Sequence, residues 1–99
     1  MRRIRFTPAA KEHLKGIWKY SFETWGEAKA DSYLMDIDAR LKNLLANPNL
    51  GRSRPEIKFG YHSIAVNKHI VFYLISETHI DIIGVLHQRM DIKSNLPTE

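Results

Sequence analysis

The sequence predicts an α+β domain with the element order β-α-α-β-β-β: an N-terminal strand, an antiparallel helical hairpin and then a three-stranded antiparallel meander. Two observations indicate this fold class. Apolar residues recur at helical spacing through residues 8–46, and three strand-like runs separated by short turns follow between residues 63 and 86. Because neither a helical stripe nor an apolar sheet face is stable uncovered, we expect the hairpin to pack on one face of the sheet.

The chain begins with a short strand that leads directly into a helix. Residues 3–6 alternate polar and apolar side chains, as a half-buried strand does. Thr7 then acts as an N-cap and Pro8 as the first helical residue, where the missing N–H costs nothing. The first helix carries an apolar stripe formed by Ala10, Leu14, Ile17, Ser21 and Trp25. Gly26 ends the helix, and we expect the short strand to pair with one of the later strands.

A second helix follows after almost no linker. Its apolar stripe consists of Ala30, Leu34, Ile37, Leu41 and Leu44. The Asn-Pro-Asn sequence at 47–49 ends it, and the short connection between the helices predicts an antiparallel hairpin. Residues 50–60 are polar and basic, so we expect a loop with little regular structure.

Three strand-like runs complete the fold. They cover residues 63–66, 69–75 and 80–86, with turns at 67–68 and 76–78. The short turns predict antiparallel pairing, and the last two runs are apolar on both faces, as central strands are. The length of 99 residues fits a single domain, 1–99.

The composition excludes several classes of function. The chain has no cysteine, which excludes disulfides, cysteine-containing zinc sites and thiol catalysis. No apolar run approaches the ~18 residues of a membrane span, and no signal peptide is evident, so we expect a cytoplasmic protein with no membrane partner. The histidines show no zinc-motif spacing, so no metal is expected. A net charge of +4 favours nucleic acid or an acidic protein as a partner.

An ordered set of short motifs resembles the ParE-type toxins of the RelE/ParE toxin–antitoxin superfamily. These motifs are Thr7-Pro8-Ala9-Ala10, Ile17-Trp18, Trp25-Gly26, Asn47-Pro48, Gly51-Arg52, Arg54-Pro55-Glu56-Ile57, Gly60-Tyr61-His62-Ser63, His69-Ile70-Val71-Phe72-Tyr73 and Val85-Leu86-His87-Gln88-Arg89-Met90-Asp91. The similarity extends from Ile4 to Asp91. One departure is His62, because the family usually has an arginine beside the serine. A basic contact there would be weaker or pH-dependent, since histidine titrates near neutrality.

The resemblance implies a toxin that a ribbon-helix-helix, ParD-like antitoxin covers with its flexible C-terminal segment. Released ParE toxins poison DNA gyrase and block replication, whereas the RelE-like relatives share the fold and cut mRNA on the ribosome. We therefore expect a gyrase inhibitor that has no catalytic turnover and no cofactor, and that contacts DNA only through the antitoxin or gyrase. The alternatives are an mRNA interferase, an inactive antitoxin-binding member and a plain nucleic-acid-binding module.

The candidate binding residues form two groups. The target-binding candidates are Arg52, Arg54, Lys58, His62, His87 and Arg89. Such side chains contact phosphates and acidic protein surfaces, although solvated loops and strand-end ion pairs give the same pattern. The antitoxin-binding candidates are Trp18, Phe22 and Tyr33. Trp18 fits a core position equally well, and Trp25 is expected in the core.

Ribonuclease chemistry would need a general acid and base beside the ribose 2′-hydroxyl, with cations on the phosphate. The side chains available for these roles are Lys58, Tyr73, His87 and Arg89. No tyrosine follows Arg89, so the set of catalytic groups is incomplete and we expect no catalytic residues. The sequence assigns no function to His13 and His79, and His69 is expected to be an ordinary strand-end residue.

Overall fold

The computed structural model describes residues 2–96 and confirms the α+β class. Its elements are β1 (Arg3–Phe6), α1 (Pro8–Trp25), α2 (Glu27–Ala46), the 3-10 helix η1 (Pro48–Leu50), β2 (Arg52–Ser53), β3 (His62–Val66), β4 (His69–Ile75), β5 (His79–His87) and α3 (Ile92–Asn95). The predicted helices and strands are present within one or two residues of their expected bounds. The sequence did not predict η1, β2 or α3, each of which has only two to four residues.

The strands form one sheet with the order β1-β5-β4-β3-β2. β1 runs parallel to β5, and the other neighbours are antiparallel. The expectation that β1 pairs with a later strand is confirmed, as is the central position of β4 and β5. The expected loop after α2 is largely irregular, but β2 pairs with β3 and extends the sheet by one short edge strand.

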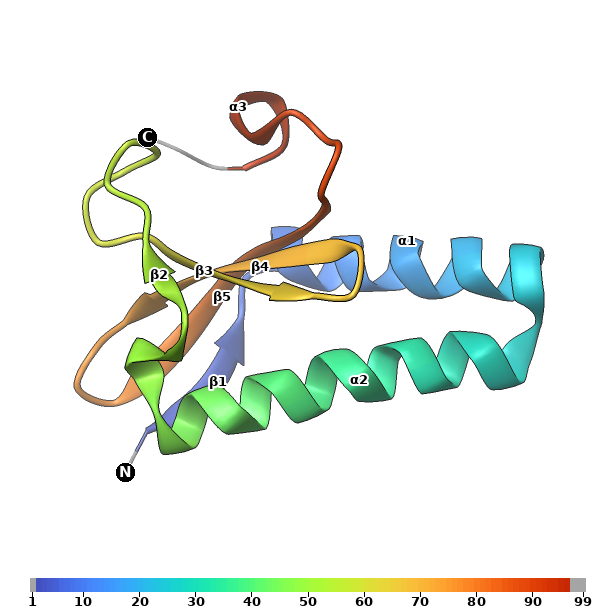
Figure 1. Ribbon diagram of the computed structural model, residues 1–99, viewed down its shortest axis with the longest axis horizontal. Helices are drawn as coiled ribbons and strands as arrows, with labels where there is room; N and C mark the ends of the chain where they lie inside the picture. Colours follow the sequence, from blue (N-terminus) through green and yellow to red (C-terminus); the bar gives the residue numbers. More distant parts are fainter. Residues whose placement is uncertain (1, 97–99) are drawn as a thin grey trace.

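Both faces of the sheet are covered, and by different parts of the chain. The helical hairpin covers one face, where residues of α2 such as Ile37 and Leu41 pack against Val71 and Ile82 of the central strands. The other face is covered by the loop between β2 and β3 and by the segment after β5 (Figure 1). Leu96 of that segment is buried against this second face. The hairpin cover was predicted, whereas the second cover was not.

β5 carries a β-bulge, and α1 and the C-terminal segment both approach the strand beside it. The register with β4 passes from Phe72↔Gly84 to Tyr73↔Ile82, which leaves Ile83 as the extra residue. A Cβ at Gly84 would lie 2.4 Å from Leu96 Cδ2 and 3.1 Å from His13 Cε1. Glycine at this position therefore allows both Leu96 and His13 to approach the β5 backbone closely.

The helical hairpin extends past the end of the sheet (Figure 1). Gly26 alone joins the helices, with a φ of 94° that favours glycine. At the other end of α1, the Thr7 hydroxyl accepts a hydrogen bond from the Ala10 N–H, as an N-cap should. Because the closed end of the hairpin has no sheet beneath it, Trp25 is 59% exposed, and the expectation of a core position for it is wrong. Leu34 is only partly buried at the margin of the core.

Candidate functional site

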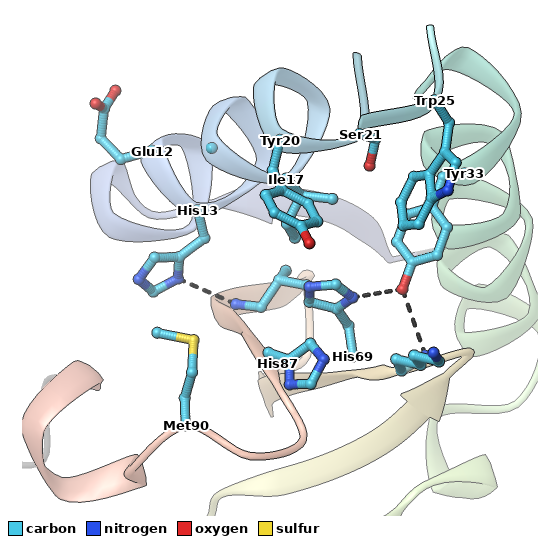
Figure 2. Close-up of a pocket in the computed structure, with 13 residues that line it drawn as sticks. Glu12, His13, Ile17, Tyr20, Ser21, Trp25, Tyr33, His69, His87 and Met90 are labelled. Carbon is cyan, nitrogen blue, oxygen red and sulfur yellow. Dashed lines mark hydrogen bonds between the residues drawn. The ribbon is translucent and has the colours of Figure 1, made fainter. Parts of the chain in front are cut away.

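An open cavity lies between the helical hairpin and the adjacent ends of β4 and β5. Its volume is about 560 Å³. It is lined by Glu12, His13, Gly16, Ile17, Tyr20, Ser21, Trp25, Tyr33, Lys68, His69, Val85, His87 and Met90. Figure 2 shows three imidazole rings from three different elements around it, and we call it the histidine pocket.

Register and helix periodicity bring the three histidines together. His69 begins β4 and His87 ends β5, and the two are direct register partners. Their ring centroids lie 5.3 Å apart in an edge-to-face arrangement. His13 lies on the same side of α1 as Ile17, facing β5. The sequence assigned no role to His13 or His69. The signals present were the position of His13, three residues after Ala10 of the helical stripe, and the position of His69, directly after the turn at 67–68.

Hydrogen bonds within the chain occupy the Nδ1 atom of each ring. The Val85 N–H donates to His13 Nδ1 at 3.1 Å, and the Arg89 N–H donates to His87 Nδ1 at 3.2 Å. His69 Nδ1 shares a short hydrogen bond with the Tyr33 hydroxyl, whose oxygen also accepts from the Lys68 N–H at 3.4 Å (Figure 2). These bonds fix the orientation of all three rings.

Burial keeps the pocket uncharged on the side of His69. Desolvation, and then the charge of His87, lower the pKa of His69 to about 4. Desolvation also lowers the pKa of His13 and raises the pKa of the Tyr33 hydroxyl. His69 is therefore neutral at pH 7, and Tyr33 retains its proton.

Two large aromatic side chains are exposed at the mouth of the pocket. Tyr20 is 63% exposed and Trp25 is 59% exposed, and their rings meet edge to face at 6.0 Å. Of the three antitoxin-binding candidates, only Tyr33 lines the pocket. Trp18 and Phe22 stack on each other at 5.1 Å, and Trp18 Nε1–H donates to Asp31 on α2, outside the pocket lining.

The target-binding candidates are divided between two regions. The first region contains Arg52 in β2, Arg54 and Lys58 in the loop that follows, and His62 at the start of β3. We call residues 52–60 the basic loop. His87 and Arg89 lie at the end of β5, where His87 faces the histidine pocket. A second cavity of about 570 Å³ separates the basic loop from the C-terminal segment, and Met90 lines both cavities.

Arg54 holds the basic loop in place. Its side chain is only 13% exposed, its Nε pairs with Glu56 at 2.6 Å, and its Nη1 donates to the buried Ser63 hydroxyl at 3.0 Å. The guanidinium also lies 5.7 Å from the centre of the Phe72 ring. These contacts engage the charge inside the domain, so Arg54 is poorly placed as a target-contacting cation. Arg52 is exposed on the edge strand.

The tip of the basic loop presents an aromatic side chain to solvent. Phe59 is 94% exposed. The loop beneath it is closed by hydrogen bonds from Arg54 N–H to the Tyr61 carbonyl (2.7 Å) and from Tyr61 N–H to the Lys58 carbonyl (3.1 Å). His62 donates from Nδ1 to the Gly60 carbonyl at 3.0 Å and stacks on Tyr73. Phe59 is therefore held out by an ordered loop.

Tyr73, one of the side chains considered for RNA cleavage, is fully buried. Its hydroxyl donates to the Pro48 carbonyl at 3.0 Å and accepts from the Gly51 N–H at 3.1 Å. This geometry gives Tyr73 a structural role. Within residues 2–96, no group of three or more His, Asp or Glu side chains is placed to hold a metal ion, and no described helix is long and apolar enough to cross a membrane.

Comparison with known proteins gives relatives over nearly the whole chain. A family described as "ParE toxin of type II toxin-antitoxin system, parDE" matches residues 4–92. Toxin ParE1 of Mycobacterium tuberculosis is 39% identical over 95% of this chain and 97% of its own length. Toxin ParE1 of Caulobacter vibrioides is 32% identical, with 97% of this chain and 99% of its own length covered.

Two solved structures share the fold. One, described as the chromosomal ParDE system from P. aeruginosa, has a TM-score of 0.76 at 21% identity and covers 88% of this chain and 96% of its own. The YoeB dimer of Staphylococcus aureus has a TM-score of 0.64 at 24% identity, with 87% and 95% covered. The fold, the family match over residues 4–92 and relatives at 39% and 32% identity show that this chain belongs to the ParE toxin family of type II toxin–antitoxin systems.

Proposed function

We propose that a ParD-like antitoxin neutralises this toxin by occupying the histidine pocket, and that the free toxin inhibits DNA gyrase without catalytic turnover. The observation that supports the antitoxin site is the open pocket with Tyr20 and Trp25 exposed at its mouth. Exposed aromatic side chains around an apolar cavity are typical of partner-binding sites, because their burial supplies much of the binding free energy. The family match to a parDE system supports an antitoxin as this partner.

The proposed target surface and the histidine pocket lie on opposite sides of the C-terminal segment. Phe59 at the loop tip and the exposed Arg52 give an aromatic anchor beside positive charge. Such a combination suits an acidic protein surface, where an aromatic side chain fills a pocket and cations speed the encounter. The two surfaces are distinct, so the antitoxin need not cover the target-binding loop in order to bind.

The proposal of a binder instead of a nuclease rests on the positions of the titratable side chains. Tyr73 is buried with both hydrogen-bonding positions of its hydroxyl occupied. The Nδ1 atom of His87 accepts from the Arg89 N–H, and burial together with His87 keeps the neighbouring His69 neutral. General acid–base catalysis needs a donor and an acceptor that reach the same substrate. This arrangement favours inhibition by binding.

Co-purification with the ribbon-helix-helix protein of the neighbouring reading frame tests the antitoxin site. We expect the Tyr20→Ser/Trp25→Ser double variant to weaken the complex by at least about tenfold, since two exposed aromatic anchors are lost. Phe22→Ser is the matched control, because Phe22 is 45% exposed on α1 but lies outside the pocket. Equal loss in the control, or none in the double variant, would place the antitoxin elsewhere.

A further inference from the structure

The histidine pocket offers imidazole N–H groups that have no hydrogen-bond partner within residues 2–96. A neutral imidazole carries one ring proton, so a ring whose Nδ1 accepts a hydrogen bond carries its proton on Nε2. His13 and His87 accept from backbone N–H groups and are fixed in this form. His69 Nδ1 and the Tyr33 hydroxyl share the third bond, and either can donate in it, because the Tyr33 oxygen keeps a second lone pair when it accepts from the Lys68 N–H.

The Nε2 atoms of the three rings remain accessible, and those of His13 and His87 carry a fixed proton. Within residues 2–96, none of them has a hydrogen-bond partner in the chain. The described residues also contain no buried side-chain nitrogen or oxygen that lacks a partner, so these Nε2 atoms are reached by solvent. Imidazole donors that line an apolar cavity are suited to an acceptor with several lone pairs.

We propose that the histidine pocket recognises a carboxylate, supplied by an aspartate or glutamate that stands next to a large apolar side chain in the antitoxin segment. This inference rests on the proposed antitoxin site and assigns the chemistry that the site selects. Ile17, Tyr20 and Trp25 provide the apolar wall for the neighbouring side chain. The histidine donors provide the polar wall, and the low polarity of the cavity strengthens their hydrogen bonds to a charged oxygen.

Charge around the pocket favours an anion. Lys68 lines the cavity, and Arg89 lies two residues after His87. The opposing charge is Glu12, which already pairs with Lys15 at 3.1 Å. A phosphate would also accept from imidazole N–H groups, but an apolar wall contributes nothing to a phosphate of a nucleic-acid backbone. A carboxylate attached to an apolar segment uses both walls.

The test compares a carboxylate with its neutral isostere on the intact chain. The probes are indole-3-propionate and indole-3-propionamide, titrated at pH 7.5 and followed by the imidazole resonances. We expect the carboxylate to bind at least about fivefold more tightly than the amide and to shift the ring signals of His13, His69 and His87. Equal affinities, or shifts confined to other residues, would overturn the inference, as would inorganic phosphate that displaces the carboxylate at equal concentration.

Histidine variants separate donor chemistry from apolar packing. His87→Phe should reduce the preference for carboxylate over amide to less than about twofold while the amide still binds. His79→Phe is the control, because His79 lies at the opposite end of β5 and outside the pocket. An unchanged preference in folded His87→Phe protein would show that the imidazole does not select the anion. The wild-type comparison of the two probes decides the question if this variant does not fold.

A final arm distinguishes this inference from the proposed function. Each acidic residue of the antitoxin C-terminal segment is changed to its amide, and at least one change should weaken the wild-type complex about tenfold or more. The same change should have less than about twofold effect on His87→Phe toxin. If Tyr20→Ser/Trp25→Ser disrupts the complex but no acidic residue matters, carboxylate recognition is wrong and the antitoxin site stands.

Discussion

Removal of the Tyr73 hydroxyl tests how the segment before the basic loop is attached to the core. Tyr73→Phe keeps the buried ring and deletes only the oxygen that bonds to Pro48 and Gly51. Because both bonds are part-buried, each group left unsatisfied should cost about 1–2 kcal/mol, in the lower part of the usual range, and the loss of both bonds about 2–4 kcal/mol. A small domain has a total stability of roughly 5–15 kcal/mol, so this is a large fraction.

Urea unfolding followed by circular dichroism measures this effect. The free energy of unfolding should fall by about 2–4 kcal/mol with an unchanged dependence on urea concentration. Tyr20→Phe is the matched control, because the Tyr20 side chain is largely exposed and its contact with Trp25 depends on the ring, which phenylalanine keeps. A loss below about 0.5 kcal/mol in Tyr73→Phe, within the range of ordinary surface changes, would refute the anchoring role of this hydroxyl.

Three further perturbations test the site. Because the pKa of His69 is about 4 in the folded chain against an ordinary 6.5, the unfolded chain takes up this proton first as the pH falls. Stability should therefore fall by about 1–3 kcal/mol between pH 6.5 and pH 4, and His69→Gln should flatten this part of the curve of unfolding free energy against pH. Arg54→Ala should lower the free energy of unfolding by about 1–3 kcal/mol, since it leaves the buried Ser63 hydroxyl without its partner and uncovers Phe72. Arg52→Ala should leave the melting temperature unchanged and reduce toxicity. Equal destabilisation by both variants would show that Arg54 has no special structural role. Phe59→Ala should change the free energy of unfolding by less than about 0.5 kcal/mol and weaken gyrase inhibition about tenfold, and full inhibition by this variant would remove Phe59 from the target surface.

The helices and central strands were predictable because local signals determine them. Thr7 and Gly26 define the ends of α1, and the two-sided apolar runs of β4 and β5 indicate central strands. By contrast, β2 has two residues and forms only through pairing with β3, so no periodicity marks it. The α3 segment is similarly short, and its place is determined by Leu96 packing on the second sheet face.

The site was predicted less well because its geometry is tertiary. His69 and His87 become neighbours only through the β4–β5 register, and His13 can approach β5 because Gly84 has no side chain. Trp25 fits the helical stripe, yet the hairpin is longer than the sheet that it covers, which exposes this residue. Arg54 has the sequence pattern of a surface cation, and only the fold reveals Ser63 and Phe72 beside it.

The most direct test of the proposed function exposes the purified, antitoxin-free chain to both possible targets. DNA gyrase supercoiling and the integrity of ribosome-bound mRNA are measured in parallel over the same range of toxin concentrations. Inhibition of supercoiling or accumulation of cleaved DNA, with intact mRNA, is the predicted result. Codon-specific mRNA cleavage that is lost in His87→Ala, with gyrase unaffected, would contradict the proposal and identify the chain as a ribosome-dependent nuclease.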